Sequence, residues 1–212
     1  KDDYFPVHRI YCVGRNYRAH DLEMGGTGRS LPCFFMKPAD AVFPVADNDI
    51  AEIRYPTMTN DLHHEVELVA AIGKGGCNIP VEEAAKHVWG WAVAVDLTRR
   101  DLQAKAKGRP WEAAKAFDHS APISYIRPAA KCPAMDKADV WLYINAEKRQ
   151  NGTTADMIWS VAEVIAEISK YWELAPGDLI LTGTPGGVGA VNRGETVNAG
   201  VSGAGAVRFK LV

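Results

Sequence analysis

The sequence is poor in the features that mark several protein classes. It has four cysteines, which are far apart and include no C-x-x-C pair: Cys12, Cys33, Cys77 and Cys132. This spacing excludes zinc-finger and thioredoxin-type motifs and argues against a disulfide framework in a chain of 212 residues. Scattered thiols are typical of buried cysteines in a reducing cytoplasm, which is the location that we expect.

Long apolar runs and concentrated charge are also lacking. No apolar stretch approaches the roughly 20 residues that cross a bilayer, which excludes a spanning helix. The net charge is −2 without a basic block, so neither nucleic acid nor an anionic membrane is an expected partner. There is no internal repeat, low-complexity segment or linker. With 47% hydrophobic residues, the chain can bury a large core, and we expect a single domain over residues 1–212.

Short apolar segments with a few helical patterns between them indicate a strand-rich α+β domain and argue against a doubly wound sheet. Strands are expected at 9–14, 33–38, 48–55, 65–72, 88–95, 141–145, 179–181 and 206–212. Helical segments are expected at 15–24, 80–86, 99–107 (with Thr98 as the N-cap) and 154–172. Residues 111–120 are expected to be irregular, and Asn151-Gly152 is a turn signal.

Three carboxylates lie on or directly after two of these strands, and we expect them to form one cluster. Glu65 and Glu67 are two apart, so in an extended strand they project from one face. Asp96 follows the apolar strand 88–95 directly and is the natural third member of the set. Three carboxylates without cysteine or paired histidine favour a hard cation, Mg²⁺ or Mn²⁺. The alternative, for the Glu65–Glu67 pair alone, is the solvated face of a half-exposed strand.

Two further segments carry candidate catalytic groups. His20 and Glu23 are three apart, so in a helical turn they share a face, where a histidine oriented by a carboxylate can activate water. Lys115 lies among small and aromatic residues and could hold a cation near a developing oxyanion. On local evidence alone, a surface His–Glu pair and a lysine whose stem lies along apolar surface remain the alternatives.

Two glycine-rich segments are expected to be loops, and the sequence leaves two interpretations open for each. Residues 182–189 follow an apolar strand, and their backbone N–H groups together with Thr184 could bind a carboxylate. No Gly-Lys-[Ser/Thr] follows, so this is not a P-loop, and a plain tight turn is the alternative. The loop Gly25–Ser30 is either a lid or a connector.

Taken together, these segments resemble the fumarylacetoacetate hydrolase family in its single-domain acylpyruvate hydrolase branch. The matching motifs follow one another along nearly the whole chain: YCVGRNY at 11–17, His20 with Glu23, FMKP at 35–38, HEVEL at 64–68, DLTRRDLQ at 96–103, KAFD at 115–118 and LTGTPGGVG at 181–189. The resemblance implies a mixed β-sandwich roll, a 2-keto acid as the small-molecule substrate, one Mg²⁺ or Mn²⁺ per chain and a homodimer.

The resemblance also implies roles for individual residues. The implied metal ligands are Glu65, Glu67 and Asp96. The implied catalytic residues are His20, Glu23 and Lys115. The implied substrate-binding residues are Arg15, Tyr17, Arg100, Gln103, Gly183 and Thr184, with Lys37 as an additional candidate.

The implied reaction is the metal-dependent hydrolysis of a C–C bond in an acylpyruvate. The branch suggests fumarylpyruvate, which would give fumarate and pyruvate in gentisate-type aromatic catabolism, with Arg29 or Arg109 binding the second carboxylate. The alternatives within the family are decarboxylation of oxaloacetate and the decarboxylase/isomerase reaction of the homoprotocatechuate pathway. Outside it, a non-catalytic ligand-binding protein and a nucleotide-binding protein are the rivals.

Overall fold

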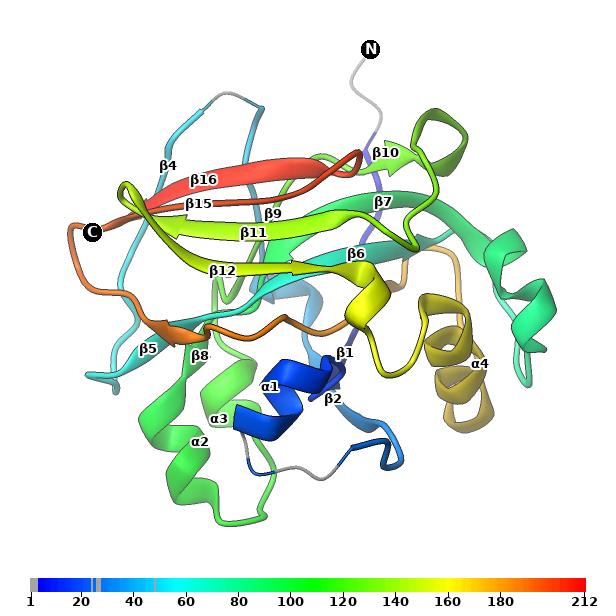
Figure 1. The fold of residues 1–212 in the computed structure, drawn as a ribbon, viewed down its shortest axis with the longest axis horizontal. Coiled ribbons are helices and arrows are strands. Elements are labelled where there is room, and N and C mark those ends of the chain that lie inside the picture. The colour runs from blue at the N-terminus through cyan, green and yellow to red at the C-terminus, as the bar shows by residue number, and fades with distance from the viewer. Residues whose placement is uncertain (1–3, 24, 26–27, 48) are drawn as a thin grey trace.

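The computed structural model describes residues 4–23, 25, 28–47 and 49–212, and it has three sheets (Figure 1). The eight-stranded sheet has the order β2–β1–β13–β6–β7–β9–β3, with β10 beside β7. Its strands are β1 (Ile10–Gly14), β2 (Cys33–Lys37), β3 (Val42–Pro44), β6 (Val66–Ile72), β7 (Val88–Val95), β9 (Ala121–Ile123), β10 (Arg127–Pro128) and β13 (Leu179–Leu181).

The five-stranded sheet has the order β12–β11–β15–β16–β4, and the three-stranded sheet has the order β14–β5–β8. Their strands are β4 (Ala51–Ile53), β5 (Leu62–His64), β8 (Thr98–Arg99), β11 (Asp139–Ile144), β12 (Glu147–Thr153), β14 (Gly189–Ala190), β15 (Thr196–Val201) and β16 (Gly205–Leu211). The strand-rich α+β prediction, with curled mixed sheets, is confirmed.

Within the described residues, four α-helices lie outside the sheets: α1 (Arg18–Glu23), α2 (Arg100–Ala106), α3 (Glu112–Lys115) and α4 (Val161–Tyr171). In Figure 1, α1, α2 and α3 gather on the side of the eight-stranded sheet opposite the five-stranded sheet. The short 3₁₀ turns are Ala39–Ala41, Val81–His87, Ala129–Lys131 and Thr154–Asp156. No helix in the described part of the chain is long and apolar enough to cross a membrane.

Strand β6 is buried on both faces, and this explains its nearly continuous apolar sequence. Val66 and Leu68 pack in the core beneath the five-stranded sheet. On the opposite face, Val69 and Ala71 belong to a second core with residues of β1 and β13. Because side chains alternate, the face that carries Val69 and Ala71 also carries Glu67 and Glu65.

The pairing of β6 with β7 brings the third carboxylate to the same place. The strands are antiparallel, with Val66 opposite Val95 and Glu67 opposite Ala94. One step further, the N–H of Asp96 donates to the carbonyl of Glu65 at 2.8 Å. Asp96 therefore lies opposite Glu65 and on the same face, although it comes just after the end of β7.

Strands β1 and β13 are parallel neighbours, with Tyr11 opposite Ile180, so their carboxyl ends lie at one edge of the sheet. Strand β1 leads through Arg15 into α1, and β13 leads into the segment 182–187. The Asn16 amide joins the two exits, since its Nδ2 donates to the carbonyl of Thr182 at 2.8 Å and to that of Trp159 at 2.9 Å.

Several local predictions are wrong, for identifiable reasons. The helix expected at 154–172 begins only at Val161, because Ser160 forms a capping box with Glu163. The Thr98 hydroxyl is not an N-cap but donates to the carbonyl of Asp96 at 3.3 Å, and α2 begins at Arg100. Residues 111–120 are not wholly irregular, because α3 lies within them.

The remaining differences concern a turn, a helix and the thiols. Asn151-Gly152 lies inside β12 rather than in a turn, and the helix expected at 80–86 is a 3₁₀ helix. All four cysteines are free thiols, but only Cys12 is buried, whereas Cys33 and Cys77 are exposed.

Candidate active site

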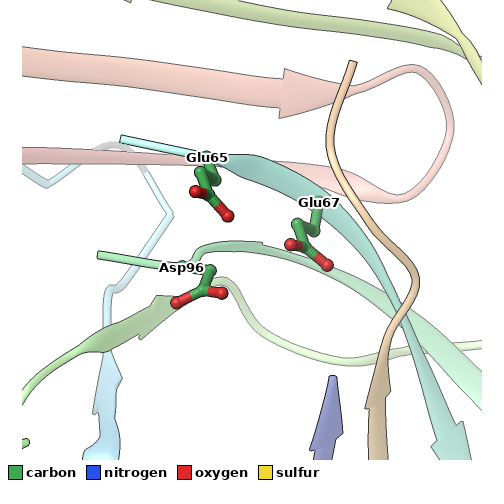
Figure 2. Close-up of side chains that lie close together, drawn as sticks. All are labelled: Glu65, Glu67 and Asp96. Carbon is green, nitrogen blue, oxygen red and sulfur yellow. The ribbon is translucent and has the colours of Figure 1, made fainter. Parts of the chain in front are cut away.

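Glu65, Glu67 and Asp96 form one cluster (Figure 2). Each offers a carboxylate oxygen, these oxygens all lie within 4.8 Å of one another, and all three side chains are buried. Figure 2 shows the two glutamates projecting from one side of β6 toward Asp96. The cluster predicted from strand alternation is therefore present, and the alternative of a solvated strand face is wrong.

Three cations surround the cluster. Lys115 Nζ lies 2.8 Å from Glu65 Oε2 and 2.7 Å from Asp96 Oδ2. Arg100 pairs with Glu65, and Lys37 Nζ lies 2.8 Å from Asp96 Oδ1. Burial opposes ionisation of Glu65, but Lys115 and Arg100 outweigh it and hold the pKa of Glu65 below its ordinary value. Burial likewise opposes the charge on Lys115, but Asp96 and Glu65 raise its pKa, so this lysine stays charged.

Glu67 is the carboxylate of the cluster whose negative charge is least neutralised by neighbouring groups. Its Oε2 accepts a hydrogen bond from the N–H of Gly183 at 2.6 Å, and among the described residues no cation pairs with it. Burial raises the pKa of Glu67 well above its ordinary value, and the charges of Asp96 and Glu65 raise it further. Asp96 Oδ1 is close to Lys37 but accepts no hydrogen bond of good geometry within the described part of the chain.

These features fit a hard divalent cation. The three acids offer only carboxylate oxygens, the ligands that Mg²⁺ and Mn²⁺ prefer. A cation among them would relieve the repulsion that burdens Glu67 and would occupy the poorly satisfied oxygen of Asp96. The residues present therefore suit the metal that the sequence predicted.

His20 and Glu23 lie on α1 beside the carboxylates. His20 Nδ1 is 3.5 Å from Glu23 Oε2, and His20 is buried whereas Glu23 is half exposed. The predicted helical turn thus brings the pair together. Glu23 Oε1 accepts a hydrogen bond from the N–H of Gly187 at 3.1 Å. A Cβ at Gly186 would meet this oxygen at 2.8 Å, so the glycine allows the turn to approach α1.

A small cavity joins these groups. It measures about 20 Å³, enough for roughly one water molecule. Its lining includes His20, Glu65, Glu67 and Lys115, and also four of the predicted substrate-binding residues: Arg15, Arg100, Gln103 and Thr184.

Tyr17 and Gly183 are placed differently. Tyr17 lines a larger neighbouring cavity of about 910 Å³ on the other side of α1. Its buried hydroxyl has no hydrogen-bond partner among the described residues, and burial followed by the charge of Glu67 raises its pKa. The N–H of Gly183 is engaged by Glu67 and is not free to bind an anion here.

The loop Gly25–Ser30 includes Gly26 and Thr27, which lie outside the described residues, and its role as a lid stays a prediction. Arg29, at the end of this loop, pairs with Glu163 at 2.7 Å and lies over the Trp159 ring, with its guanidinium carbon 4.0 Å from the ring centroid.

Sequence reasoning missed the amides that hold the site together. Asn16 is buried and fixes the exits of β1 and β13, and Gln150 bridges the segments beside Glu65 and Thr184. Asn16 lies inside a motif that was recognised, but Gln150 lies in the polar stretch EKRQNGT, where nothing distinguishes it from its exposed neighbours.

Comparisons with known proteins show which family the chain belongs to. Residues 9–212 match the model of the fumarylacetoacetate (FAA) hydrolase C-terminal family. The crystal structure of fumarylpyruvate hydrolase from Pseudomonas aeruginosa in complex with Mn²⁺ and pyruvate superposes with a TM-score of 0.97 and 52% identity, covering 100% of this chain and 92% of that one.

Curated relatives carry other names. The mitochondrial oxaloacetate tautomerase FAHD1 of Rattus norvegicus is 43% identical over 204 residues, which cover 95% of this chain and 90% of the relative. The mitochondrial oxaloacetate decarboxylase of Dictyostelium discoideum is 40% identical over 197 residues, which cover 92% of this chain and 89% of the relative. The match over nearly the whole chain and the buried acidic cluster lead to one conclusion: the protein is an enzyme of the fumarylacetoacetate hydrolase family.

Proposed function

We propose that the protein hydrolyses the C–C bond between the acyl group and the pyruvate unit of an acylpyruvate, with fumarylpyruvate as the first candidate substrate. The observation that carries this proposal is the shared cavity, in which Glu65 and Glu67 of the three-carboxylate cluster face His20 and Lys115. Such a site combines charge stabilisation for an enolate with a base for water.

Glu65, Glu67 and Asp96 would hold Mg²⁺ or Mn²⁺. When bound there, a divalent cation supplies Lewis-acid stabilisation of negative charge on the oxygens of a 2-keto acid. The protein offsets the charge of two of these carboxylates by pairing Glu65 and Asp96 with Lys115, and it leaves the charge of Glu67 for the metal to neutralise.

His20 would act as the general base. If its Nδ1 carries a proton toward Glu23 Oε2, 3.5 Å away, Nε2 is left unprotonated to accept a proton from water. The water oxygen then bonds to the distal carbonyl carbon, and collapse of this adduct breaks the C–C bond. The electron pair of that bond passes to the pyruvate unit as an enolate, which His20 protonates on carbon.

Lys115 would stabilise the enolate as it forms. Its ammonium is buried and stays charged because Asp96 and Glu65 raise its pKa, so it can lower the energy of a nearby oxyanion without transferring a proton. Arg100, which donates to Gln103, would orient the substrate carboxylate together with Thr184.

Fumarylpyruvate is favoured by the likeness to the Pseudomonas aeruginosa enzyme at 52% identity. Oxaloacetate is the second candidate, because the relatives from Rattus norvegicus and Dictyostelium discoideum are named for its tautomerisation and decarboxylation. Decarboxylation would release CO₂ and leave the enolate of pyruvate, whereas tautomerisation would pass through the enolate of oxaloacetate itself. Neither reaction needs an attacking water. The paired His20 and Glu23 favour hydrolysis.

The test is the ultraviolet absorbance of the enolised diketone, followed with fumarylpyruvate and with acetylpyruvate, each with and without Mn²⁺ or Mg²⁺. The proposal expects metal-dependent loss of absorbance with pyruvate and the corresponding acid as products. Consumption of oxaloacetate alone would retain the metal site but overturn the proposed reaction.

A further inference from the structure

We propose that Gln150 is a positioning residue that turns the Thr184 hydroxyl into a hydrogen-bond donor aimed at the substrate carboxylate. The inference rests on the proposed function for the identity of that substrate. Gln150 is fully buried and is the one buried residue of β12, in which the other side chains are exposed or half-buried. A bulge at Arg149, where the pairing of β12 with β11 shifts register, turns the side chain of Gln150 inward.

The amide of Gln150 uses its full hydrogen-bonding capacity. Nε2 donates to Thr184 Oγ1 at 2.7 Å and to the carbonyl of Pro185 at 2.9 Å. Oε1 lies 2.9 Å from His64 Nδ1 and accepts from the N–H of Val66 at 3.2 Å. One side chain therefore connects the residues on either side of Glu65 to the segment that carries Thr184.

These partners fix the orientation of the amide. The carbonyl of Pro185 can only accept and the N–H of Val66 can only donate, so the nitrogen must face Pro185 and the oxygen must face Val66. The same nitrogen faces Thr184 Oγ1, which therefore accepts. The hydroxyl proton of Thr184 is then left to donate elsewhere, and Thr184 lines the cavity that contains Glu65, Glu67 and Lys115.

The segment that carries Thr184 is held against β12 by close backbone packing. A Cβ at Gly187 would lie 2.1 Å from the carbonyl oxygen of Arg149, and a Cβ at Gly152 would lie 2.7 Å from the Cβ of Pro185. In Figure 1 this segment, between β13 and β14, runs alongside β12. The spacing between this segment and β12 is thus set by glycines, and the direction of the Thr184 hydroxyl is set by Gln150.

A Gln150→Glu substitution separates this role from simple packing. The new oxygen replaces Nε2 opposite Thr184 and Pro185. If ionised, it accepts from the Thr184 hydroxyl. If protonated, its one proton goes to the Pro185 carbonyl, which can only accept, and the oxygen still accepts from Thr184. In both states the hydroxyl is turned away from the cavity.

The experiment measures the dissociation constant of pyruvate on the Mn²⁺-loaded protein by calorimetry, together with kcat and KM for fumarylpyruvate. Thr184→Val should weaken pyruvate binding about 10- to 100-fold, the cost of losing a hydrogen bond to a charged group. Gln150→Glu should weaken it by a similar factor and raise KM more than it lowers kcat. Thr184→Val should then add little in the Gln150→Glu background. Thr184→Ser, which keeps the hydroxyl, should bind pyruvate almost as tightly as the wild type does. In the Gln150→Glu background, the same substitution should not restore tight binding.

Val140→Ala, which shortens a buried residue of the adjacent strand β11, is the control. It should lower the melting temperature and leave pyruvate binding unchanged. Independent, multiplicative effects of Gln150→Glu and Thr184→Val would overturn the inference, as would unchanged binding in Gln150→Glu. If Gln150→Glu does not fold, the same cycle with Gln150→Met decides by the same criterion. If the two substitutions show coupled effects on pyruvate binding but the protein cleaves no acylpyruvate, the proposed function is refuted and the role of Gln150 stands.

Discussion

Glu67→Gln should stabilise the metal-free protein and at the same time remove its response to metal. The amide introduced by this substitution keeps an oxygen to accept from the N–H of Gly183 but carries no charge. The ligand oxygens of Glu65, Glu67 and Asp96 lie within 4.8 Å of one another, and at an effective dielectric constant of about 20 two unit charges at that distance repel by about 3.5 kcal/mol. The neighbouring cations offset part of this, so we expect a net gain of about 1–3 kcal/mol.

The gain in the free energy of unfolding should increase with pH. Burial and the neighbouring carboxylates raise the pKa of Glu67 in the folded protein. The stabilisation that the wild type gains from the raised pKa of Glu67 is therefore fully present below about pH 4.3, the pKa of glutamate in the unfolded chain. As the pH rises above this value, the free energy of unfolding falls by up to about 1.4 kcal/mol per pH unit. The advantage of Glu67→Gln should accordingly grow as the pH rises above about 4.3, the unfolded pKa of glutamate.

The assay is urea unfolding of both proteins in EDTA and in Mn²⁺. At a metal concentration 100 times the dissociation constant, the wild type should gain about 2.7 kcal/mol. The variant should gain far less, because it has lost a charged ligand. The reasoning would be refuted by a variant that is less stable than wild type in EDTA at pH 8, or by one that keeps the full stabilisation by Mn²⁺.

Three other substitutions test separate parts of the account. His20→Ala should lower hydrolysis of an acylpyruvate about 10²- to 10⁴-fold and spare any decarboxylation of oxaloacetate, and equal loss of both would contradict the assigned role. Gly186→Ala should lower kcat about 10- to 100-fold, because a Cβ there would lie 2.8 Å from Glu23 Oε1; an unchanged rate would show that this approach is not needed. Glu163→Gln should lower the free energy of unfolding by about 0.2–1 kcal/mol at pH 7, measured by urea titration, since it removes the Arg29 pair, whereas the amide oxygen still accepts the capping hydrogen bond from the N–H of Ser160. The hydrogen bond from Arg29 lowers the pKa of Glu163, so this difference is present above its ordinary value near 4.5 and should vanish as the pH falls through the lowered value; a difference that persists at pH 2 would contradict this cause.

The acidic cluster could be predicted from the sequence because its geometry follows from strand alternation. Glu65 and Glu67 are two apart on a strand, and Asp96 follows the strand that pairs with it. Likewise His20 and Glu23 meet because a helical turn spaces them by three residues. These contacts are set by local periodicity, which a sequence displays directly.

The rest depends on contacts between distant segments, which periodicity does not reveal. Lys115 belongs to a short helix in a stretch expected to be irregular, and only the folded chain brings it against Asp96. Gln150 acquires its role from a bulge in β12 and from the glycines that bring 182–187 alongside. The start of α4 at Val161 was missed because the apolar pattern continues across the capping box at Ser160.

A competition experiment tests most directly whether the protein hydrolyses fumarylpyruvate. The wild-type protein with Mn²⁺ is given fumarylpyruvate and oxaloacetate at equal concentrations, and both are followed by proton NMR in one tube, where the initial rates give the ratio of kcat/KM. We predict that fumarate and pyruvate appear together and that fumarylpyruvate is consumed first. Consumption of oxaloacetate with fumarylpyruvate left intact would contradict it.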